Sequence, residues 1–94
     1  MAADVKRASE QAFESFWRLP LNDEHRGLIK GRNGGDISNL GASKFGGAST
    51  AAAFLEKFVE DDRVWAHLDI AGGCLNPDVL GLGAKTLLNI INNL

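Results

Sequence analysis

The sequence has a single cysteine, no long apolar run and no excess of basic residues. Cys74 alone excludes an intramolecular disulfide and fits a reducing compartment. A membrane-spanning helix needs about 20 apolar residues, and a signal peptide needs a basic start followed by an apolar stretch. Because neither pattern occurs, we expect a cytoplasmic chain with no membrane partner.

The charge balance gives no reason to expect a nucleic-acid partner. Ten Lys and Arg residues against twelve Asp and Glu residues give a net charge of −2, and no basic stripe offsets the acids. A hydrophobic content of 45% favours a folded core over disorder. The 94 residues form one domain or part of one, and such a chain buries roughly 60–65% of its unfolded surface. Folding of this chain alone is therefore feasible but marginal.

Two helices are expected in the first third of the chain. Apolar residues at helical spacing predict the first, which should end near Trp17 because Pro20 restricts the residue before it. The second is predicted from Glu24 to Lys30, with Asn22 or Asp23 as its N-cap.

Two further helices are expected later in the chain, after a short extended segment at residues 36–41. The most regular helical pattern runs from about Phe45 to Val59. An apolar stripe predicts the final helix, and its members are Ala84, Leu87, Leu88, Ile91 and Leu94. No repeat or linker divides the sequence.

Residues 64–73 are the best strand candidate. Its residues alternate between two faces: Val64, Ala66, Leu68 and Ile70 on one, Trp65, His67, Asp69 and Ala71 on the other. Gly72 and Gly73 end the segment abruptly. A strand between two helical stretches predicts an α/β fold with a site near the end of that strand.

His67 and Asp69 share one face of this predicted strand and suggest a metal pair. A catalytic metal site needs about three protein ligands, and no third one is evident nearby. We therefore favour a buried histidine that is hydrogen-bonded to a carboxylate or to the backbone, with Asp69 as a structural hydrogen-bond acceptor.

Two other features suggest chemistry but have simpler explanations. Residues 81–86 place glycines before a helix, as a phosphate-binding loop does, yet they match neither the Walker pattern nor a dinucleotide fingerprint. We predict a tight turn into the last helix. Cys74 has no activating base nearby in the sequence, which favours an apolar wall residue over a nucleophile. The residues alone predict no catalytic set.

Four stretches together resemble the C-terminal part of the leucyl aminopeptidase family, also called cytosol aminopeptidase or peptidase M17. They are Phe16 to Leu21, Asp36 to Gly41, Gly47 to Val59 and Trp65 to Gly72. Their order and spacing fit the family, and the resemblance extends from about residue 2 to the end. It implies that residues 1–94 are an incomplete C-terminal segment of a three-layer α/β/α catalytic domain, with helices around one or two strands.

The resemblance also implies a function. Enzymes of this family remove N-terminal residues such as leucine from peptides, using paired zinc, manganese or magnesium ions that activate water. Their metal ligands surround an Asn-Thr-Asp-Ala-Glu-Gly-Arg motif, which these 94 residues lack. The resemblance therefore implies no catalytic residue, no metal ligand and no cofactor held by this segment alone. It implies that Ala71 and Cys74 line the pocket for the first side chain of the peptide substrate.

The family pattern bears on partners as well. Because the family is hexameric, the resemblance implies that this chain meets the remainder of the aminopeptidase chain or associates with itself. The loop from Gly73 to Gly81 is shorter than the family pattern, which affects the rim of the pocket and subunit contacts. The alternative function is a non-catalytic scaffold or interaction module derived from the same family.

Overall fold

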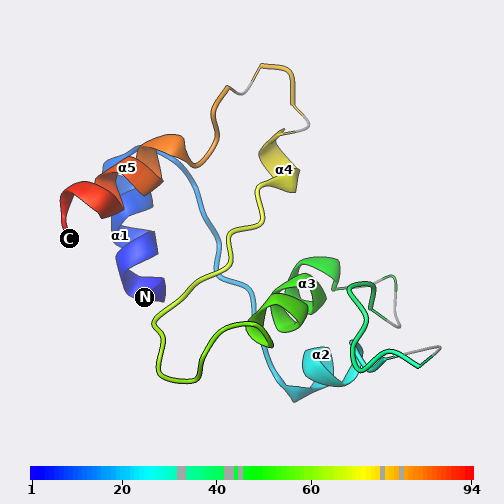
Figure 1. Cartoon of the computed structure of the whole chain (residues 1–94). Helices are drawn as coiled ribbons and strands as arrows, with labels where there is room; N and C mark the ends of the chain where they lie inside the picture. Colours follow the sequence, from blue (N-terminus) through cyan, green and yellow to red (C-terminus); the bar gives the residue numbers. More distant parts are fainter. Residues whose placement is uncertain (32–33, 42–43, 45, 75, 79) are drawn as a thin grey trace. The chain divides into compact units, whose positions relative to one another are not determined.

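The computed structural model describes all residues except 32–33, 42–43, 45, 75 and 79. The backbone of Cys74 is described, but its side chain is not. The described residues form five helices: α1 (Ala2–Gln11), α2 (Asp23–Gly27), α3 (Gly47–Glu56), α4 (Ala71–Cys74) and α5 (Ala84–Asn92) (Figure 1). The chain divides into two compact units, one formed by Met1–Arg18 with Ala66–Leu94 and the other by Leu19–Trp65. No helix of the described residues is long and apolar enough to cross a bilayer.

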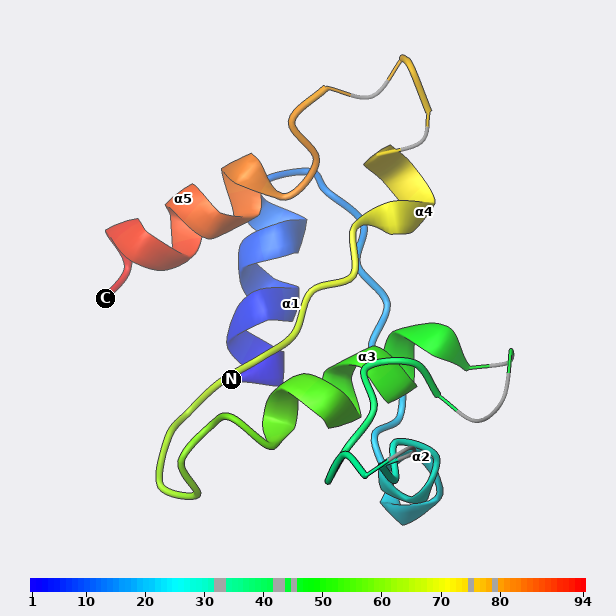
Figure 2. The same ribbon diagram turned by 45° about the vertical axis from the view of Figure 1, so that its right-hand side comes forward.

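In the first unit, α1 packs against α5, and two views of the ribbon show them side by side (Figures 1 and 2). The buried residues of this contact are small or polar. Ala8 and Ser9 of α1 are 4% and 2% exposed, and Thr86 of α5 is fully buried. Small side chains at this position allow the two helices to approach closely.

Helix α1 ends at Gln11, so the prediction that it continues to near Trp17 is wrong. The reason is a helix ending formed around Phe13, whose φ of 58° is left-handed. The amide of Phe13 donates to the carbonyl of Glu10 at 3.2 Å, and that of Glu14 donates to the carbonyl of Ser9 at 2.9 Å. These two bonds define a Schellman motif, which stops the helix well before Pro20.

In the second unit, α2 begins where its capping residue predicts. The side chain of Asn22 accepts from the amides of Glu24 at 3.1 Å and His25 at 3.4 Å, and the Asn22 amide donates to His25 Nδ1. This capping box confirms Asn22 as the N-cap. The helix ends at Gly27 rather than at Lys30, because Lys30 leaves it to form an isolated antiparallel bridge with Ile37. The predicted extended segment at residues 36–41 is thus partly observed.

Helix α3 packs against α2 in the same unit. It begins at Gly47 and ends at Glu56, three residues before the predicted end at Val59. The predicted start, Phe45, lies outside the described residues. Ser49 donates its hydroxyl to the carbonyl of Pro20 at 2.6 Å, which fixes the chain that leads into α2.

An ion pair also joins these two helices. The Arg26 guanidinium donates to both carboxylate oxygens of Glu56, at 2.7 and 3.1 Å. This bidentate contact lowers the pKa of Glu56 and raises that of Arg26, with the hydrogen bond as the largest cause in each case.

The predicted strand at residues 64–73 does not form. Residues 63–70 have no regular secondary structure, and α4 begins at Ala71, where the strand was expected to continue. A strand requires a neighbour for its backbone N–H and C=O groups, and among the described residues no segment pairs with this one. The strand component of the predicted α/β fold is therefore absent from the described part of the chain.

Candidate functional site

The site implied by the resemblance lies at the start of α4. Asp69 Oδ1 accepts a hydrogen bond from the amide of Ala71 at 2.9 Å, an Asx-type contact that orients the first turn of the helix. The prediction that Asp69 is a structural hydrogen-bond acceptor is therefore confirmed. Ala71 and Gly72 are both exposed, so the small side chain of Ala71 is accessible from solvent.

The second predicted pocket residue, Cys74, is the last residue of α4. Its side chain is outside the described part of the structure. Next to it, the side chain of Leu82 lies directly over Gly73, so that a Cβ atom on Gly73 would overlap with Leu82 Cδ2. The side chain of Leu82 thus packs against the backbone of α4 at Gly73.

His67 is not a metal ligand in the described residues, and it is not the buried, hydrogen-bonded histidine that we expected. The residue is half-buried, and among the described residues its imidazole makes no hydrogen bond. Asp69, its expected partner, bonds to Ala71 instead. In the described part of the chain, no group of three or more His, Cys, Asp or Glu side chains could hold a metal ion. These residues therefore do not fit a metal centre.

Residues 81–86, which resemble a phosphate-binding loop, bind a carboxylate of the chain itself, that of Glu14. The amides of Gly83 and Thr86 donate to the two carboxylate oxygens of Glu14 at 3.1 and 3.0 Å. The Thr86 hydroxyl adds a third bond of 2.6 Å. Gly83 has a left-handed φ of 91° and forms the N-cap of α5. The predicted tight turn into the last helix is confirmed.

These contacts also set the electrostatics of Glu14. The hydrogen bond from the Thr86 hydroxyl is the largest cause that lowers the pKa of Glu14, and the amides of Thr86 and Gly83 act in the same direction. A carboxylate is stabilised at this place because the N-terminus of a helix carries partial positive charge. Glu14 thus makes a structural contact that sequence reasoning missed, because 69 and 72 residues separate it from its partners Gly83 and Thr86.

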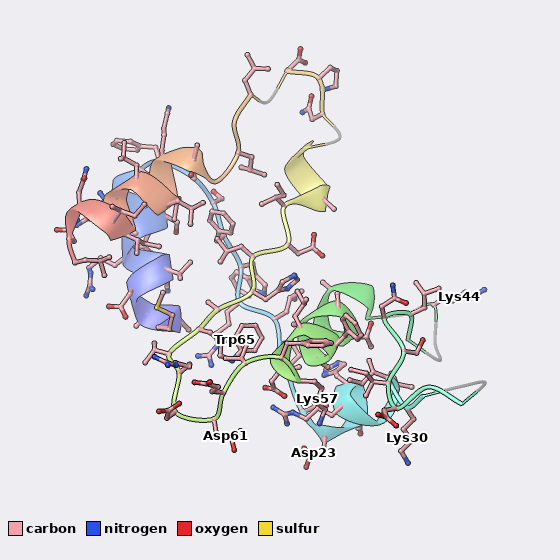
Figure 3. All side chains as sticks on the ribbon, viewed as in Figure 1. Asp23, Lys30, Lys44, Lys57, Asp61 and Trp65 are labelled. Atoms are coloured by element: carbon pink, nitrogen blue, oxygen red, sulfur yellow. The ribbon has the colours of Figure 1, made fainter. Side chains whose placement is uncertain are left out.

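A concavity of about 280 Å³ lies in the second unit, where α3 ends and the following segment turns back. Figure 3 labels three of its lining residues, Lys57, Asp61 and Trp65. The lining carries charges of both signs, and Arg63 is already paired with Glu60 at 3.0 Å. Its lining contains neither cysteine nor histidine.

Comparison with known proteins shows the family to which the chain belongs. Residues 1–87 match the catalytic domain that defines a family of peptidases. The relatives of the chain are thus hydrolases of peptide bonds. The chain belongs to the cytosol aminopeptidase family, peptidase M17. This membership is consistent with the α/β class, although the described residues form no strand.

Individual relatives agree with this assignment. A probable cytosol aminopeptidase of Prochlorococcus marinus (strain MIT 9312) is 42% identical over 101 residues, covering 99% of this chain and 20% of the relative. One from Chloroherpeton thalassium is 41% identical over 100 residues, covering 99% and 19%. One from Acinetobacter baumannii (strain AYE) is 47% identical over 72 residues, covering 77% and 14%. The chain spans about a fifth of the length of the curated relatives it matches. No solved structure matches it.

The alignment lengths bear on the loop after Gly73. The Prochlorococcus alignment extends over 101 positions, whereas the chain has 94 residues, so this chain lacks residues that the relative has. The location of the shortening stays a prediction.

Proposed function

We propose that this chain is a C-terminal segment of a cytosol-aminopeptidase-type catalytic domain, a hydrolase that removes N-terminal residues from peptides. The observation that supports this function is the family match over residues 1–87, together with relatives about 40% identical across the chain. Because the chain spans about a fifth of those relatives, the activity is assigned to an assembly that includes protein outside these 94 residues.

In that assembly, Ala71 and Cys74 form part of the wall of the pocket for the substrate's first side chain. The exposure of Ala71 supports this role, since its methyl group leaves room for a larger side chain beside it. Asp69 holds the Ala71 amide and so fixes the direction of the wall. Residues 64–70 gain strand partners there, which completes a three-layer α/β/α arrangement.

The paired zinc, manganese or magnesium ions of the family belong elsewhere in this proposal. The described residues do not fit a metal centre, so the metal ligands and the groups that act on the scissile bond are assigned to residues outside this chain. This segment contributes packing and a pocket wall. The assembly is hexameric, acts on peptides and resides in the cytoplasm.

Reconstitution tests the proposal. The Prochlorococcus marinus relative is produced without its aligned fifth, mixed with this chain and assayed with a leucine anilide in the presence of manganese or zinc. We expect turnover that requires both polypeptides and is lost on chelation. The relative's own excised fifth is the positive control. Robust turnover by this chain alone contradicts the assignment, and so does an assembly that forms but shows no turnover while the control is active. The latter result favours the scaffold alternative.

A further inference from the structure

The side chain of Leu82 supports one side of helix α4. A Cβ atom on Gly73 would overlap with Leu82 Cδ2, so this side chain packs against the helix backbone at Gly73. A Cβ atom on Gly72 would meet nothing within 4 Å, and Ala71 is exposed. Leu82 itself is half-buried. The single turn of α4 therefore rests on Leu82.

The supported side of α4 lies opposite the side that carries Ala71. An α-helix turns by about 100° per residue, so residues 71 and 73 are separated by about 200° around the helix axis. Leu82, which lies over Gly73, is therefore on nearly the opposite side of α4 from Ala71. A change at Leu82 moves the helix along the direction in which the Ala71 side chain points.

Backbone hydrogen bonds hold Leu82 in its place. The residue lies within a turn that the Ala84 amide closes by donating to the Gly81 carbonyl at 3.0 Å. The amide of the next residue, Gly83, donates to the carboxylate of Glu14 at 3.1 Å. These two bonds fix the backbone on either side of Leu82, so its side chain is a fixed support for α4.

Ile70 adds a second contact between the same two segments. The Gly73 amide donates to the Ile70 carbonyl at 3.1 Å, which ties Ile70 to the turn of α4. A Cβ atom on Gly83 would lie 3.8 Å from Ile70 Cγ2, so the side chain of Ile70 lies beside Gly83. The residues just before α5 thus contact α4 through Leu82 and the residue before α4 through Ile70.

We propose that Leu82 is a positioning residue that sets the width of the pocket for the substrate's first side chain. This inference rests on the proposed function, in which Ala71 belongs to the wall of that pocket. Leu82 does not touch the substrate. It holds α4, and α4 carries Ala71, so Leu82 acts on which side chain the pocket accepts and not on the bond that is broken.

Two substitutions should move this wall in opposite directions. Leu82→Ala removes the support, so α4 settles into the vacated space and Ala71 recedes from the pocket. Gly73→Ala adds a methyl group where Leu82 Cδ2 lies, so the helix and this side chain must separate and α4 moves toward the pocket. In the double variant, the added methyl group takes up part of the space that Leu82→Ala vacates.

The kinetic test uses the assembly of this chain with the truncated Prochlorococcus marinus relative, and it measures kcat/KM for alanine, leucine and phenylalanine anilides. For Leu82→Ala, the ratio of phenylalanine to leucine should rise by about 5-fold or more. For Gly73→Ala, the ratio of leucine to alanine should fall by about the same factor. The double variant should lie closer to the wild type than either single variant does.

Leu80→Ala is the matched control for the kinetic test. It makes the same truncation two residues before Leu82, but Leu80 is 91% exposed. Both substrate ratios should therefore equal those of the wild type. A purely structural role of Leu82 would lower kcat/KM for all three anilides by one common factor and leave the ratios unchanged.

A second measurement examines the support of α4 without using activity. Cys74 is the last residue of α4 and the only cysteine of the chain, so its rate of modification by a thiol reagent reports on this turn. The rate is followed by the mass of this chain, free and in the assembly. Leu82→Ala should raise it by about 5-fold or more, because loss of a packing side chain favours local opening. Leu80→Ala should leave it unchanged.

The outcomes separate this inference from the proposed function. An inactive wild-type assembly contradicts the proposed function, and the role in the pocket falls with it, while Cys74 modification still decides whether Leu82 holds α4. Turnover with unchanged ratios in Leu82→Ala and Gly73→Ala overturns the inference and leaves the proposed function standing. Equal Cys74 modification rates in Leu82→Ala and Leu80→Ala also overturn it, because Leu82 then does not support α4.

Discussion

Glu14 and Thr86 are joined by two hydrogen bonds although 72 residues separate them in the chain. One carboxylate oxygen accepts from the Thr86 amide at 3.0 Å and from its hydroxyl at 2.6 Å. The residue at the local N-cap position, Gly83, has no side chain that could cap α5. A residue of α1's C-terminal extension thus supplies the cap that the helix itself lacks, and it links the two ends of the first unit.

Substitution of Thr86 tests the strength of this link. Thr86→Val keeps the shape of the side chain but removes its hydroxyl, so we expect a loss of about 1–2 kcal/mol in the free energy of unfolding. Urea denaturation followed by circular dichroism measures it. The control is Thr50→Val, since Thr50 is also buried and its hydroxyl, among the described residues, bonds to the Gly47 carbonyl of its own helix. An equal loss in both variants would show that the contact with Glu14 adds nothing.

The same carboxylate predicts a dependence on pH. Folding lowers the pKa of Glu14 below its ordinary value of 4.5, chiefly through the Thr86 hydroxyl. A lowered pKa means that the contact stabilises the folded state fully above about pH 4.5 and that this contribution is lost as the pH falls through the folded pKa. The stability difference between wild type and Glu14→Gln should therefore be constant from pH 7 to about 5.5 and shrink in more acidic solution.

Urea titrations of both proteins across this pH range provide the measurement. Glu10→Gln is the control, because Glu10 is exposed and its side chain makes no hydrogen bond among the described residues. A difference between wild type and Glu14→Gln that does not change with pH would contradict the assignment of this contact to the ionised carboxylate.

In the second unit, the planar guanidinium of Arg26 should be irreplaceable. Arg26→Lys retains the charge but cannot make two parallel bonds to Glu56, so we expect the melting temperature to fall by about 2–4 °C, nearly as much as in Arg26→Ala. Asp23→Asn is the control, since Asp23 also contacts Arg26 but its side chain is 100% exposed. Full retention of stability in Arg26→Lys would mean that charge alone holds the pair.

Phe13 offers the opposite kind of prediction, a gain of stability. Its left-handed φ of 58° strains a bulky residue, and its side chain is 97% exposed, so it loses little contact when removed. Phe13→Gly should stabilise the protein by about 0.5–1 kcal/mol, because glycine adopts this conformation without a clash. Phe13→Ala retains the strained Cβ and should give no comparable gain. Chemical denaturation of both variants decides the question.

These contacts show which parts of the structure the sequence could predict. The cap of α2 was predictable because Asn22 acts on amides two and three residues away. The final helix was predictable from the spacing of Leu87, Leu88 and Ile91, but its orientation was not. That orientation depends on Glu14, and no local pattern connects residue 14 with residue 86.

The strand at residues 64–73 failed for a related reason. Alternation along a single segment shows only that its residues suit an extended conformation, whereas strand formation also requires a paired backbone. The family resemblance was established by sequence because its motifs lie within continuous stretches, and residues 1–87 match. Of the predicted pocket residues, Ala71 is exposed at the start of α4, and its place in a pocket depends on residues outside this chain that no local pattern specifies.

Ala71 gives the last prediction, which applies to the reconstituted assembly. If Ala71 lines the pocket for the substrate's first side chain, Ala71→Leu fills space that this side chain occupies. The kcat/KM for a leucine anilide should then fall by about 10-fold or more, whereas that for an alanine anilide should fall much less. Asp69→Ala is the companion variant, because it releases the Ala71 amide without adding volume and should affect both substrates alike. An equal loss for both anilides in Ala71→Leu would remove Ala71 from the pocket wall.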